Sequence, residues 1–276
     1  MSEPLDIALV QLTTPADQVA ALDHAVPYIR QAATNGARLI LLPECANMVE
    51  QRKGPKAEKL VGEHEDAFVA GVRQLTRELE VTLLIGSVIV KAENSDKAAN
   101  RTLLIDPMGE ITARYDKVHL FDADTPDGRS YRESATMRPG EQAVVAPTPW
   151  GGLGLSICYD VRFAYLYRAL AKAGADMIAV PAAFTVPTGQ AHWEVMLRAR
   201  AIETGAFVLA PAQGGAHEDG RSTYGHSMVV GPWGKMIAQF DHDRPGVLAA
   251  RLDFAEVTHA RQALPQLSHD RPIGNL

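Results

Sequence analysis

The stretch Gly154-Leu-Ser-Ile-Cys158-Tyr-Asp-Val-Arg-Phe163 has the pattern of a strand that runs directly into a helix. Over residues 153–157, leucine and isoleucine alternate with glycine and serine, which is typical of a half-buried strand. Over residues 163–173, apolar side chains recur at the three- and four-residue spacing of an amphipathic helix. The pattern predicts an α/β fold with Cys158 at a strand-to-helix junction.

Cys158 is the first candidate for a reactive group. At the start of a helix, unpaired N–H groups and the helix dipole favour the thiolate, which is the reactive form of cysteine. The alternative is that Cys158 is one more small buried apolar residue, as free cysteines commonly are. The chemistry of the other candidate residues has to decide between these interpretations.

Composition sets the class of protein. The 276 residues are 46% hydrophobic and 22% charged, which describes a globular protein with a substantial core. The net charge of −6 and the lack of a long Lys/Arg run argue against nucleic acid and favour a small-molecule partner. Two cysteines and an N-terminus unlike a signal peptide predict a cytoplasmic protein, and the near-apolar run at 81–90 is too short to span a membrane.

The first half of the chain predicts alternating strands and helices. The expected strands cover residues 6–12, 38–42 and 81–90, the expected helices cover 17–33 and 65–79, and a hairpin joins 100–105 to 111–116. Residues 46–63 are polar and irregular. Residues 117–140 form a long stretch rich in Gly, Pro and Asp, which suggests a functional loop.

The second half resembles the first. Residues 36–43 match residues 174–181, and residues 103–116 match residues 228–241. Chance similarity between apolar strands is the alternative explanation. The repeat predicts two half-domains of similar topology within a single domain of residues 1–276. Their most economical arrangement is two sheets packed face to face with helices outside, a four-layer αββα sandwich.

The repeat also separates the candidates for chemistry from the architecture. Glu44 follows a strand at a position where the second half has Ala182, and Lys117 follows a strand where the second half has His242. Ligands of α/β sheets gather beyond the carboxyl ends of strands, where Cys158 is also expected. These ends therefore predict a site with an acid, a cation and a thiol. Taken singly, the acid could be a turn residue and the cation a solvated surface group.

Three motifs carry a resemblance to a known family. Residues 41–44 (LLPE), 115–120 (YDKVHL) and 158–163 (CYDVRF) resemble the nitrilase superfamily of carbon–nitrogen hydrolases. Residues 189–203 and 224–234 are similar to the branch that contains deaminated glutathione amidase and omega-amidase. The resemblance implies the αββα sandwich, no metal, no cofactor, and a homodimer in which the C-terminal tail, about residues 254–276, takes part.

The resemblance also implies the site and its chemistry. Glu44, Lys117 and Cys158 would form the catalytic set, with Glu133 as a second glutamate. Glu44 would deprotonate Cys158 for attack on an amide carbonyl, while Lys117 and the backbone N–H of Tyr159 would stabilise the oxyanion. A thioester would form and be hydrolysed, giving a carboxylate and ammonia.

Small linear amides are the substrates that this resemblance implies, above all deaminated glutathione or a related α-keto acid amide. Omega-amidase, N-carbamoyl amino acid hydrolase, aliphatic amidase, nitrilase and acyltransferase activities are the alternatives within the class. A non-catalytic binding or regulatory relative is the alternative outside it, and the intact Glu–Lys–Cys set argues against that. The family commonly has Pro-Glu where this chain has Ala164-Tyr165, which concerns the pocket wall.

An anionic substrate needs cations that pair with carboxylates, preferably planar guanidinium groups. Arg162 lies four residues after Cys158, Arg221 lies in the loop before the 224–234 motif, and Arg52 lies in the polar stretch after Glu44. These three arginines are the predicted substrate-binding residues.

Other constellations compete with this interpretation. A Cys–His hydrolase could pair Cys158 with one of three histidines, namely His119, His192 or His226. Residues 217–219 (His-Glu-Asp) could ligate a metal, although such acids in a polar loop are usually solvated. A disulfide between Cys45 and Cys158 is unfavourable in a reducing compartment.

Overall fold

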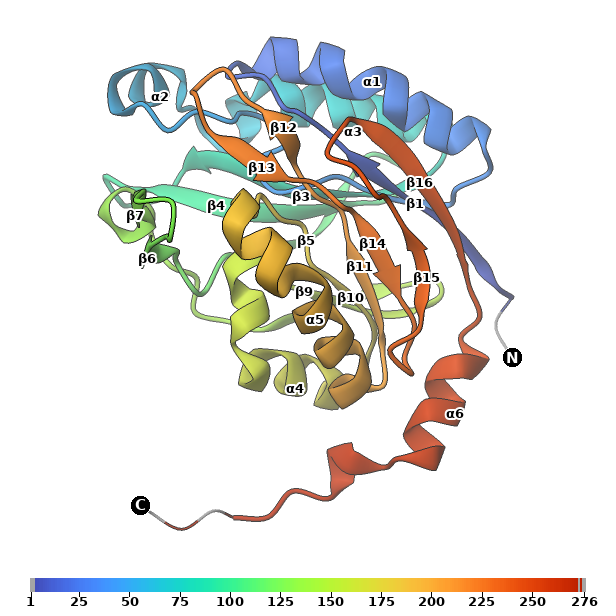
Figure 1. Cartoon of the computed structure of the whole chain (residues 1–276). Coiled ribbons are helices and arrows are strands. Elements are labelled where there is room, and N and C mark those ends of the chain that lie inside the picture. The colour runs from blue at the N-terminus through green and yellow to red at the C-terminus, as the bar shows by residue number, and fades with distance from the viewer. Residues whose placement is uncertain (1–2, 273, 275–276) are drawn as a thin grey trace.

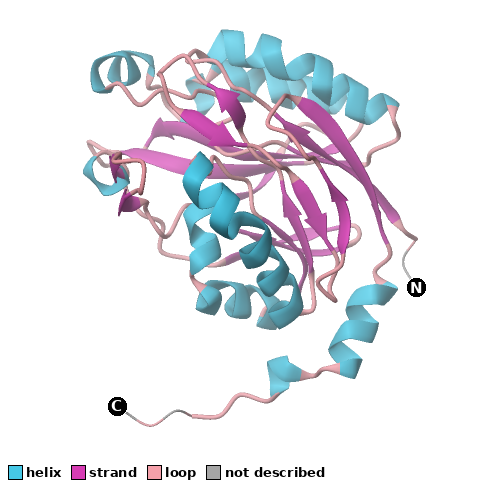
Figure 2. Ribbon diagram, viewed as in Figure 1, coloured by secondary structure: helices cyan, strands magenta, loops and turns pink. Residues whose placement is uncertain are grey.

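Two six-stranded sheets pack face to face, with helices on their outer faces (Figures 1 and 2). This arrangement comes from a computed structural model that describes residues 3–272 and residue 274. The first sheet has the order β16-β1-β2-β3-β4-β5, and the second has the order β15-β14-β11-β10-β9-β8. The predicted four-layer αββα sandwich is confirmed.

The elements of the sandwich have the following bounds. The first sheet consists of β1 (Leu5–Gln11), β2 (Leu39–Leu41), β3 (Thr82–Lys91), β4 (Ala98–Ile105), β5 (Ile111–Asp116) and β16 (Gly246–Leu252). The second consists of β8 (Val144–Thr148), β9 (Gly151–Leu155), β10 (Ala175–Ala179), β11 (Phe207–Ala210), β14 (Met228–Val230) and β15 (Met236–Gln239). The helices are α1 (Gln18–Thr34), α2 (Lys53–Lys59), α3 (Ala67–Leu79), α4 (Ala164–Lys172), α5 (Val186–Thr204) and α6 (Ala255–Ala263).

Alternation of apolar side chains explains why both faces of the first sheet are covered. In β1, Leu5, Ile7 and Leu9 belong to the core that includes both sheets, whereas Ala8 and Val10 belong to a second core shared with α1 and α3. Successive side chains of a strand point to opposite faces, so a continuously apolar strand needs a packing layer on each side. The first sheet has those two layers.

The strand orders confirm the internal repeat. The sequence β1-β2-β3-β4-β5 across the first sheet has the same form as β9-β10-β11-β14-β15 across the second. Residues 36–43 and 174–181 therefore lead through the second strand of each half, and residues 103–116 and 228–241 form equivalent hairpins. Strands β16 and β8 occupy matching edges, antiparallel to β1 and β9.

Two stretches hold more regular structure than the sequence predicts. The polar stretch 46–63 includes α2, and the loop 117–140 includes a small hairpin with a helical turn. The short elements outside the two large sheets are β6 (Asp122–Asp124), β7 (Ser130–Arg132), β12 (Gly214–Ala216), β13 (Ser222–Tyr224), and the turns η1 (Glu63–Glu65), η2 (Glu133–Ala135), η3 (Cys158–Arg162) and η4 (Gln266–Ser268). The sequence does not predict these elements, because they bury little apolar surface and so lack an apolar periodicity.

The C-terminal segment leaves the sheets after β16 and passes beside α4. Figure 1 shows α6 and residues 264–272 below the sandwich, and Arg168 of α4 donates a hydrogen bond to the carbonyl of Gln266 (2.9 Å). None of the helices in the described part of the chain combines the length and apolar character needed to cross a bilayer.

Candidate active site

The three predicted catalytic residues come together at the carboxyl ends of strands from both sheets. Glu44 follows β2, Lys117 follows β5, and Cys158 follows β9. All three line one cavity of about 660 Å³. Their exposed fractions are 4%, 2% and 9%, so the cavity places ionisable groups where water is scarce.

Cys158 sits on a sharp turn between β9 and η3. Its φ of 49° lies in the left-handed region, which is uncommon for residues other than glycine and is concentrated at functional sites. Its N–H donates a hydrogen bond to the carbonyl of Pro181 (2.9 Å). The next N–H, that of Tyr159, has no backbone acceptor among the described residues, as expected for the first turn of a helix. An oxyanion donor is therefore available beside the thiol.

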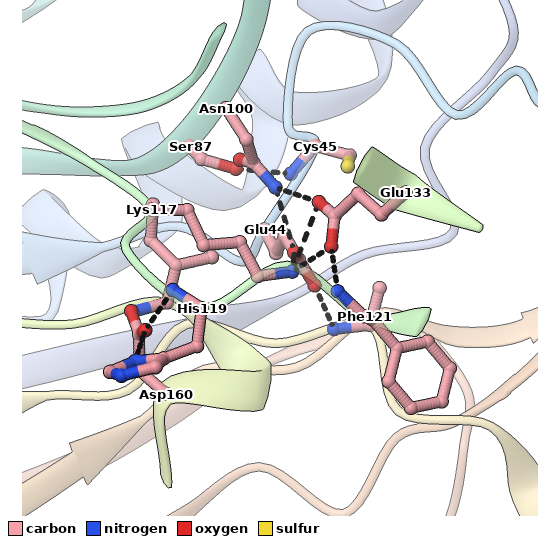
Figure 3. Close-up of polar contacts among 12 residues, drawn as sticks. Glu44, Cys45, Ser87, Asn100, Lys117, His119, Phe121, Glu133 and Asp160 are labelled. Atoms are coloured by element: carbon pink, nitrogen blue, oxygen red, sulfur yellow. Dashed lines mark hydrogen bonds and ion pairs between the residues drawn. The ribbon is translucent and has the colours of Figure 1, made fainter. Parts of the chain in front are cut away.

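Asp160 fastens this turn to the strand end that carries the lysine. The buried carboxyl group accepts hydrogen bonds from the N–H of Ile157 (2.8 Å) and the hydroxyl of Tyr115 (2.7 Å). It also accepts one from the N–H of His119 (3.0 Å), whose Nδ1 lies 2.7 Å away (Figure 3). Residues 115–119 and 157–160 therefore hold their positions relative to each other.

Lys117 lies between two glutamates. Its Nζ is 2.9 Å from Oε1 of Glu44, 2.9 Å from Oε2 of Glu133 and 3.1 Å from Oε1 of Glu133 (Figure 3). The side chain of Glu133 is 16% exposed. A buried ion pair needs further hydrogen bonds to its remaining oxygens, because desolvation otherwise outweighs the attraction.

Those further hydrogen bonds are present. Asn100 Nδ2 donates to both carboxyl groups, at 2.9 Å to Glu44 and 3.2 Å to Glu133. The N–H of Ala183 donates to the other oxygen of Glu44 (2.9 Å), and the N–H of Phe121 donates to Glu133 (2.6 Å). The orientation of each carboxyl group is therefore fixed before any substrate arrives.

These contacts set the protonation states. Burial by itself raises the pKa of Glu44, but the charge and hydrogen bond of Lys117, with smaller effects of Cys158 and Asn100, outweigh it and lower the pKa. Burial lowers the pKa of Lys117, and the charges of Glu133 and Glu44 reverse this, so the pKa is raised well above its usual value. At neutral pH the lysine is charged and Glu44 is a carboxylate.

The thiol behaves differently from the sequence-based expectation. Burial and the charge of Glu44 raise the pKa of Cys158 well above its ordinary value, and the opposing charge of Lys117 is the smaller effect. The helical turn that follows Cys158 has five residues, so it offers a weak dipole. The expected stabilisation of a thiolate by the helix is wrong, and the resting group is a thiol.

Two of the three predicted substrate-binding arginines line the cavity. Arg162 stacks over Tyr159 and Phe184, with its guanidinium carbon 5.8 and 5.7 Å from the two ring centroids. Arg221 also lines the cavity, directly before Ser222 and Thr223 of β13. Arg52 is not among the lining residues in the described structure, and its guanidinium pairs with Glu50 (2.5 Å).

The three histidines of the Cys–His alternative have other partners. His119 Nδ1 contacts Asp160, His192 Nδ1 contacts Arg162 at 3.3 Å, and His226 Nδ1 contacts the carbonyl of Tyr224 at 2.6 Å. The described lining of the cavity contains none of the three histidines. This arrangement favours Glu44 over a histidine as the base.

The loop considered for a metal is occupied by internal contacts. His217 is buried, and its Nε2 lies 2.8 Å from the hydroxyl of Thr223. Burial lowers the pKa of His217 to about 4. Across residues 3–272 and 274, no group of three or more His, Cys, Asp or Glu side chains is arranged to hold a metal ion. Cys45 and Cys158 are free thiols.

Sequence reasoning missed Asn100, Asp160 and Lys56. Asn100 is a buried amide inside a mostly apolar strand. A polar residue at such a position could have indicated a functional role. Asp160 follows Cys158 by two residues and could have been suspected as a capping residue. Lys56 lines the cavity from α2, and the polar stretch around it gives no signal of this position.

The sandwich, with two glutamates, a lysine and a thiol in one cavity, is an arrangement suited to the hydrolysis of amide-type bonds. The comparisons agree with this chemistry. Residues 6–262 match the family model described as carbon-nitrogen hydrolase. The chain therefore belongs to the carbon–nitrogen hydrolase family, whose members are hydrolases acting on C–N bonds other than peptide bonds.

Individual relatives cover nearly the whole chain. Deaminated glutathione amidase of Synechocystis sp. (strain PCC 6803) is 40% identical over 97% of this chain and 98% of its own length. The crystal structure of Saccharomyces cerevisiae Nit3, a member of branch 10 of the nitrilase superfamily, has a TM-score of 0.86 and 29% identity over 98% of this chain and 97% of that one.

One solved relative carries a covalent label. It is a mutant of the amidase from Nesterenkonia sp. AN1 with the acetamide moiety of fluoroacetamide added covalently at the active-site cysteine. Its TM-score is 0.79 and its identity is 30%, over 94% of each chain.

Proposed function

We propose that the whole chain acts as a single catalytic domain, a cysteine-dependent amidase with Cys158 as nucleophile. Glu44 is the general acid and base, and Lys117 and the N–H of Tyr159 stabilise the oxyanion. The observation that carries this proposal is the Nζ of Lys117 at 2.9 Å from both Glu44 and Glu133, beside a buried thiol. The two free thiols favour a cytoplasmic location.

The first half-reaction acylates the thiol. Glu44 takes the proton of Cys158 as sulfur bonds to the amide carbon, and the carbonyl electrons move onto oxygen. When the C–N bond breaks, nitrogen takes the proton from Glu44 and leaves as an amine. The second half-reaction repeats this with water, whose proton passes through Glu44 to the departing sulfur while the carboxylate product forms.

The protonation states explain why the oxyanion contacts matter. The pKa of Cys158 is raised and that of Glu44 is lowered, so proton transfer in the empty site is uphill. Transfer therefore has to accompany C–S bond formation, when negative charge moves onto the substrate oxygen. Fixed donors pointing at that oxygen stabilise this charge without reorganisation, and removal of one such donor typically costs about 10²- to 10³-fold in rate.

For the substrate, we propose an α-keto acid amide of the deaminated glutathione type. The relative that supports this is 40% identical over nearly the full length of both chains and is named for that substrate. In deaminated glutathione the amide nitrogen belongs to cysteinylglycine, so hydrolysis releases a dipeptide. The expected release of ammonia applies only to primary amides such as α-ketoglutaramate, and an ammonia assay would miss the main reaction.

A substrate panel tests this proposal. The purified enzyme is given deaminated glutathione, α-ketoglutaramate, an N-carbamoyl amino acid, an aliphatic amide and a nitrile, and the carboxylate product is quantified. The keto acid amides should have the highest kcat/KM, and Cys158→Ala should abolish turnover of every substrate. Highest kcat/KM for the neutral aliphatic amide would contradict the proposed substrate, and full turnover by Cys158→Ala would contradict the mechanism.

We also propose a homodimer formed through the face of α4 and α5. In α4, Leu166, Tyr167 and Leu170 are buried in the chain's own core, so they are not available to a partner subunit. Val19 and Met108 are exposed elsewhere, but five of the exposed large hydrophobic side chains lie on α4, α5 and the segments beside them. They are Tyr165 (65%), Val195 (69%), Ile202 (46%), Trp233 (61%) and Leu264 (50%).

Contacts connect part of this face with the C-terminal tail. The carbonyl of Gly234 accepts a hydrogen bond from Arg198 of α5 (3.0 Å), and Gln266 donates to the carbonyl of Ile202 (2.6 Å). Apolar groups exposed together are typical of an interaction surface. Light scattering at micromolar concentration should give twice the mass of one chain, and Trp233→Glu should shift it toward the monomer. A monomeric wild-type protein would contradict the proposed dimer.

A further inference from the structure

The cationic side chains that line the cavity differ in whether they are paired with a carboxylate or another acceptor. Lys117 is held by Glu44 and Glu133. Arg132 is exposed and pairs with Asp124 at 2.9 Å. Lys97 is exposed and donates to a backbone carbonyl at 2.7 Å. Arg162 stacks over Tyr159 and Phe184 and contacts His192. Of the two remaining lining cations, Lys56 forms no ion pair with a described residue, and Arg221 has only Asp219, 3.4 Å from its Nε.

Arg221 is partly buried on the cavity wall, and its charge is poorly matched. Its side chain is 15% exposed, and its buried Nε has no hydrogen-bond acceptor within the described part of the chain. The nearest carboxyl group is that of Asp219, at 3.4 Å. That carboxyl group already accepts hydrogen bonds from the N–H of Arg221 (3.1 Å) and the N–H of Gln51 (3.1 Å). A buried donor left without an acceptor is destabilising unless a ligand supplies one.

Lys56 faces the same part of the cavity from α2. It is partly buried, and its Nζ forms no hydrogen bond with any residue that the structure describes. Burial lowers the pKa of Lys56, and the positive charge of Arg221 acts in the same direction. The charges of both residues also affect Cys45, the residue after Glu44. Both cations line the cavity that Glu44 and Cys45 also line.

We propose that Lys56 and Arg221 form a subsite for the carboxylate of the substrate's acyl half. This inference rests on the proposed amidase function and specifies its substrate. A carboxylate between the two side chains would accept from Nε of Arg221 and from Nζ of Lys56, and it would separate two like charges. Charge-assisted hydrogen bonds of this kind are about twice as strong as neutral ones.

Burial explains why the acyl half, and not the leaving amine, occupies this wall. The acyl group stays bound to sulfur through both half-reactions, whereas the amine has to leave and water has to enter. Lys97 and Arg132 also line the cavity but are exposed to solvent. Lys56 and Arg221, which are partly buried, suit the half of the substrate that remains bound.

Matched substrates test the subsite. α-Ketoglutaramate carries the carboxylate, and 4-oxopentanamide has a methyl group in its place. Lys56→Met and Arg221→Met should each lower kcat/KM for α-ketoglutaramate by about 10- to 100-fold, mainly through KM, and should change it less than about threefold for 4-oxopentanamide. The exposed Lys91→Met serves as the control variant and should change neither. Equal losses on both substrates, or no loss on either, would overturn the subsite.

Deaminated glutathione distinguishes the two halves of the substrate. If the variants lose activity on it but keep full activity on α-ketoglutaramate, the pair binds the dipeptide half and the assignment is wrong. Calorimetry with the Cys158→Ala protein tests binding without turnover. α-Ketoglutarate should bind more tightly than 4-oxopentanoate, and Arg221→Met in that background should remove the difference. Equal binding of the two acids would overturn the subsite even if the wild-type protein is an amidase. If α-ketoglutarate binds more tightly but the wild-type protein hydrolyses no amide, the subsite stands and the amidase function is wrong.

Discussion

Cys45 and Cys158 differ mainly in their neighbours. Both line the same cavity, both have φ in the left-handed region, at 56° and 49°, and burial raises the pKa of both, to about 12 for Cys45. The charges of Glu44 and Lys117 affect both thiols, but a side-chain hydrogen bond with Glu44 contributes at Cys158 and not at Cys45. Cys158 is also followed by a backbone N–H that has no backbone acceptor among the described residues. The N–H of Cys45 is bonded to Ser87 Oγ (2.8 Å; Figure 3). The comparison teaches that burial and backbone strain do not by themselves make a nucleophile.

Removing each thiol in turn is the strongest way to break this comparison. Cys158→Ala should lower kcat by at least about 10⁴-fold, because no other group can form the thioester. Cys45→Ala should stay within about threefold of wild type. Steady-state kinetics measures both, and circular dichroism confirms that both variants fold. A large loss for Cys45→Ala in a folded protein would contradict the assigned roles.

Glu44→Gln removes the base and keeps the shape. We expect a loss of about 10²- to 10⁴-fold in kcat, because the amide cannot take the thiol proton. Asn100→Ala removes the donor that orients both glutamates and should cost less than Glu44→Gln. If Glu44→Gln kept most of the wild-type rate of acylation in a single turnover, a group other than Glu44 would have to accept the thiol proton.

Lys117→Met should affect both rate and stability. The oxyanion loses a fixed charge, which predicts a fall of about 10²- to 10³-fold in kcat. Glu44 and Glu133 lose their buried counter-charge, and breaking a buried pair typically costs about 3–5 kcal/mol in the free energy of unfolding. Chemical denaturation measures this loss. A variant as stable as wild type would show that the two carboxyl groups do not depend on the lysine.

Much of this site follows from the sequence. The alternating strand before Cys158, the repeat of two half-domains and the strand ends predicted where Glu44, Lys117 and Cys158 lie. The role of α2 could not be predicted, because its polar residues carry no apolar period and Lys56 approaches the cavity through the tertiary fold. The protonation of Cys158 could not be predicted either, since burial and the charge of Glu44 outweigh the local helical turn.

The pH dependence of kcat/KM is the smallest expected effect, and it tests the lowered pKa of Glu44 against the raised pKa of Cys158. Because the pKa of Glu44 is lowered, kcat/KM should stay level down to the ordinary glutamate value of about 4.3 and fall only below it. Because the pKa of Lys117 is raised, this lysine should stay charged through the alkaline range.

The same shift in Glu44 affects stability. A group whose pKa is lowered by folding stabilises the native state above its unfolded pKa. The contribution of Glu44 should therefore be lost as pH falls through its folded value. An acid limb near neutral pH in the kcat/KM profile would contradict these assignments.

Peptide mapping of the trapped acyl-enzyme tests the central claim most directly. The wild-type protein and Glu44→Gln are mixed with a slow amide substrate, quenched in acid, digested and analysed by mass spectrometry. We predict an acyl adduct on the peptide that contains Cys158, no adduct on the peptide that contains Cys45, and much slower labelling in Glu44→Gln. An adduct on Cys45, or full turnover with no adduct on Cys158 under conditions that should trap it, would contradict the account.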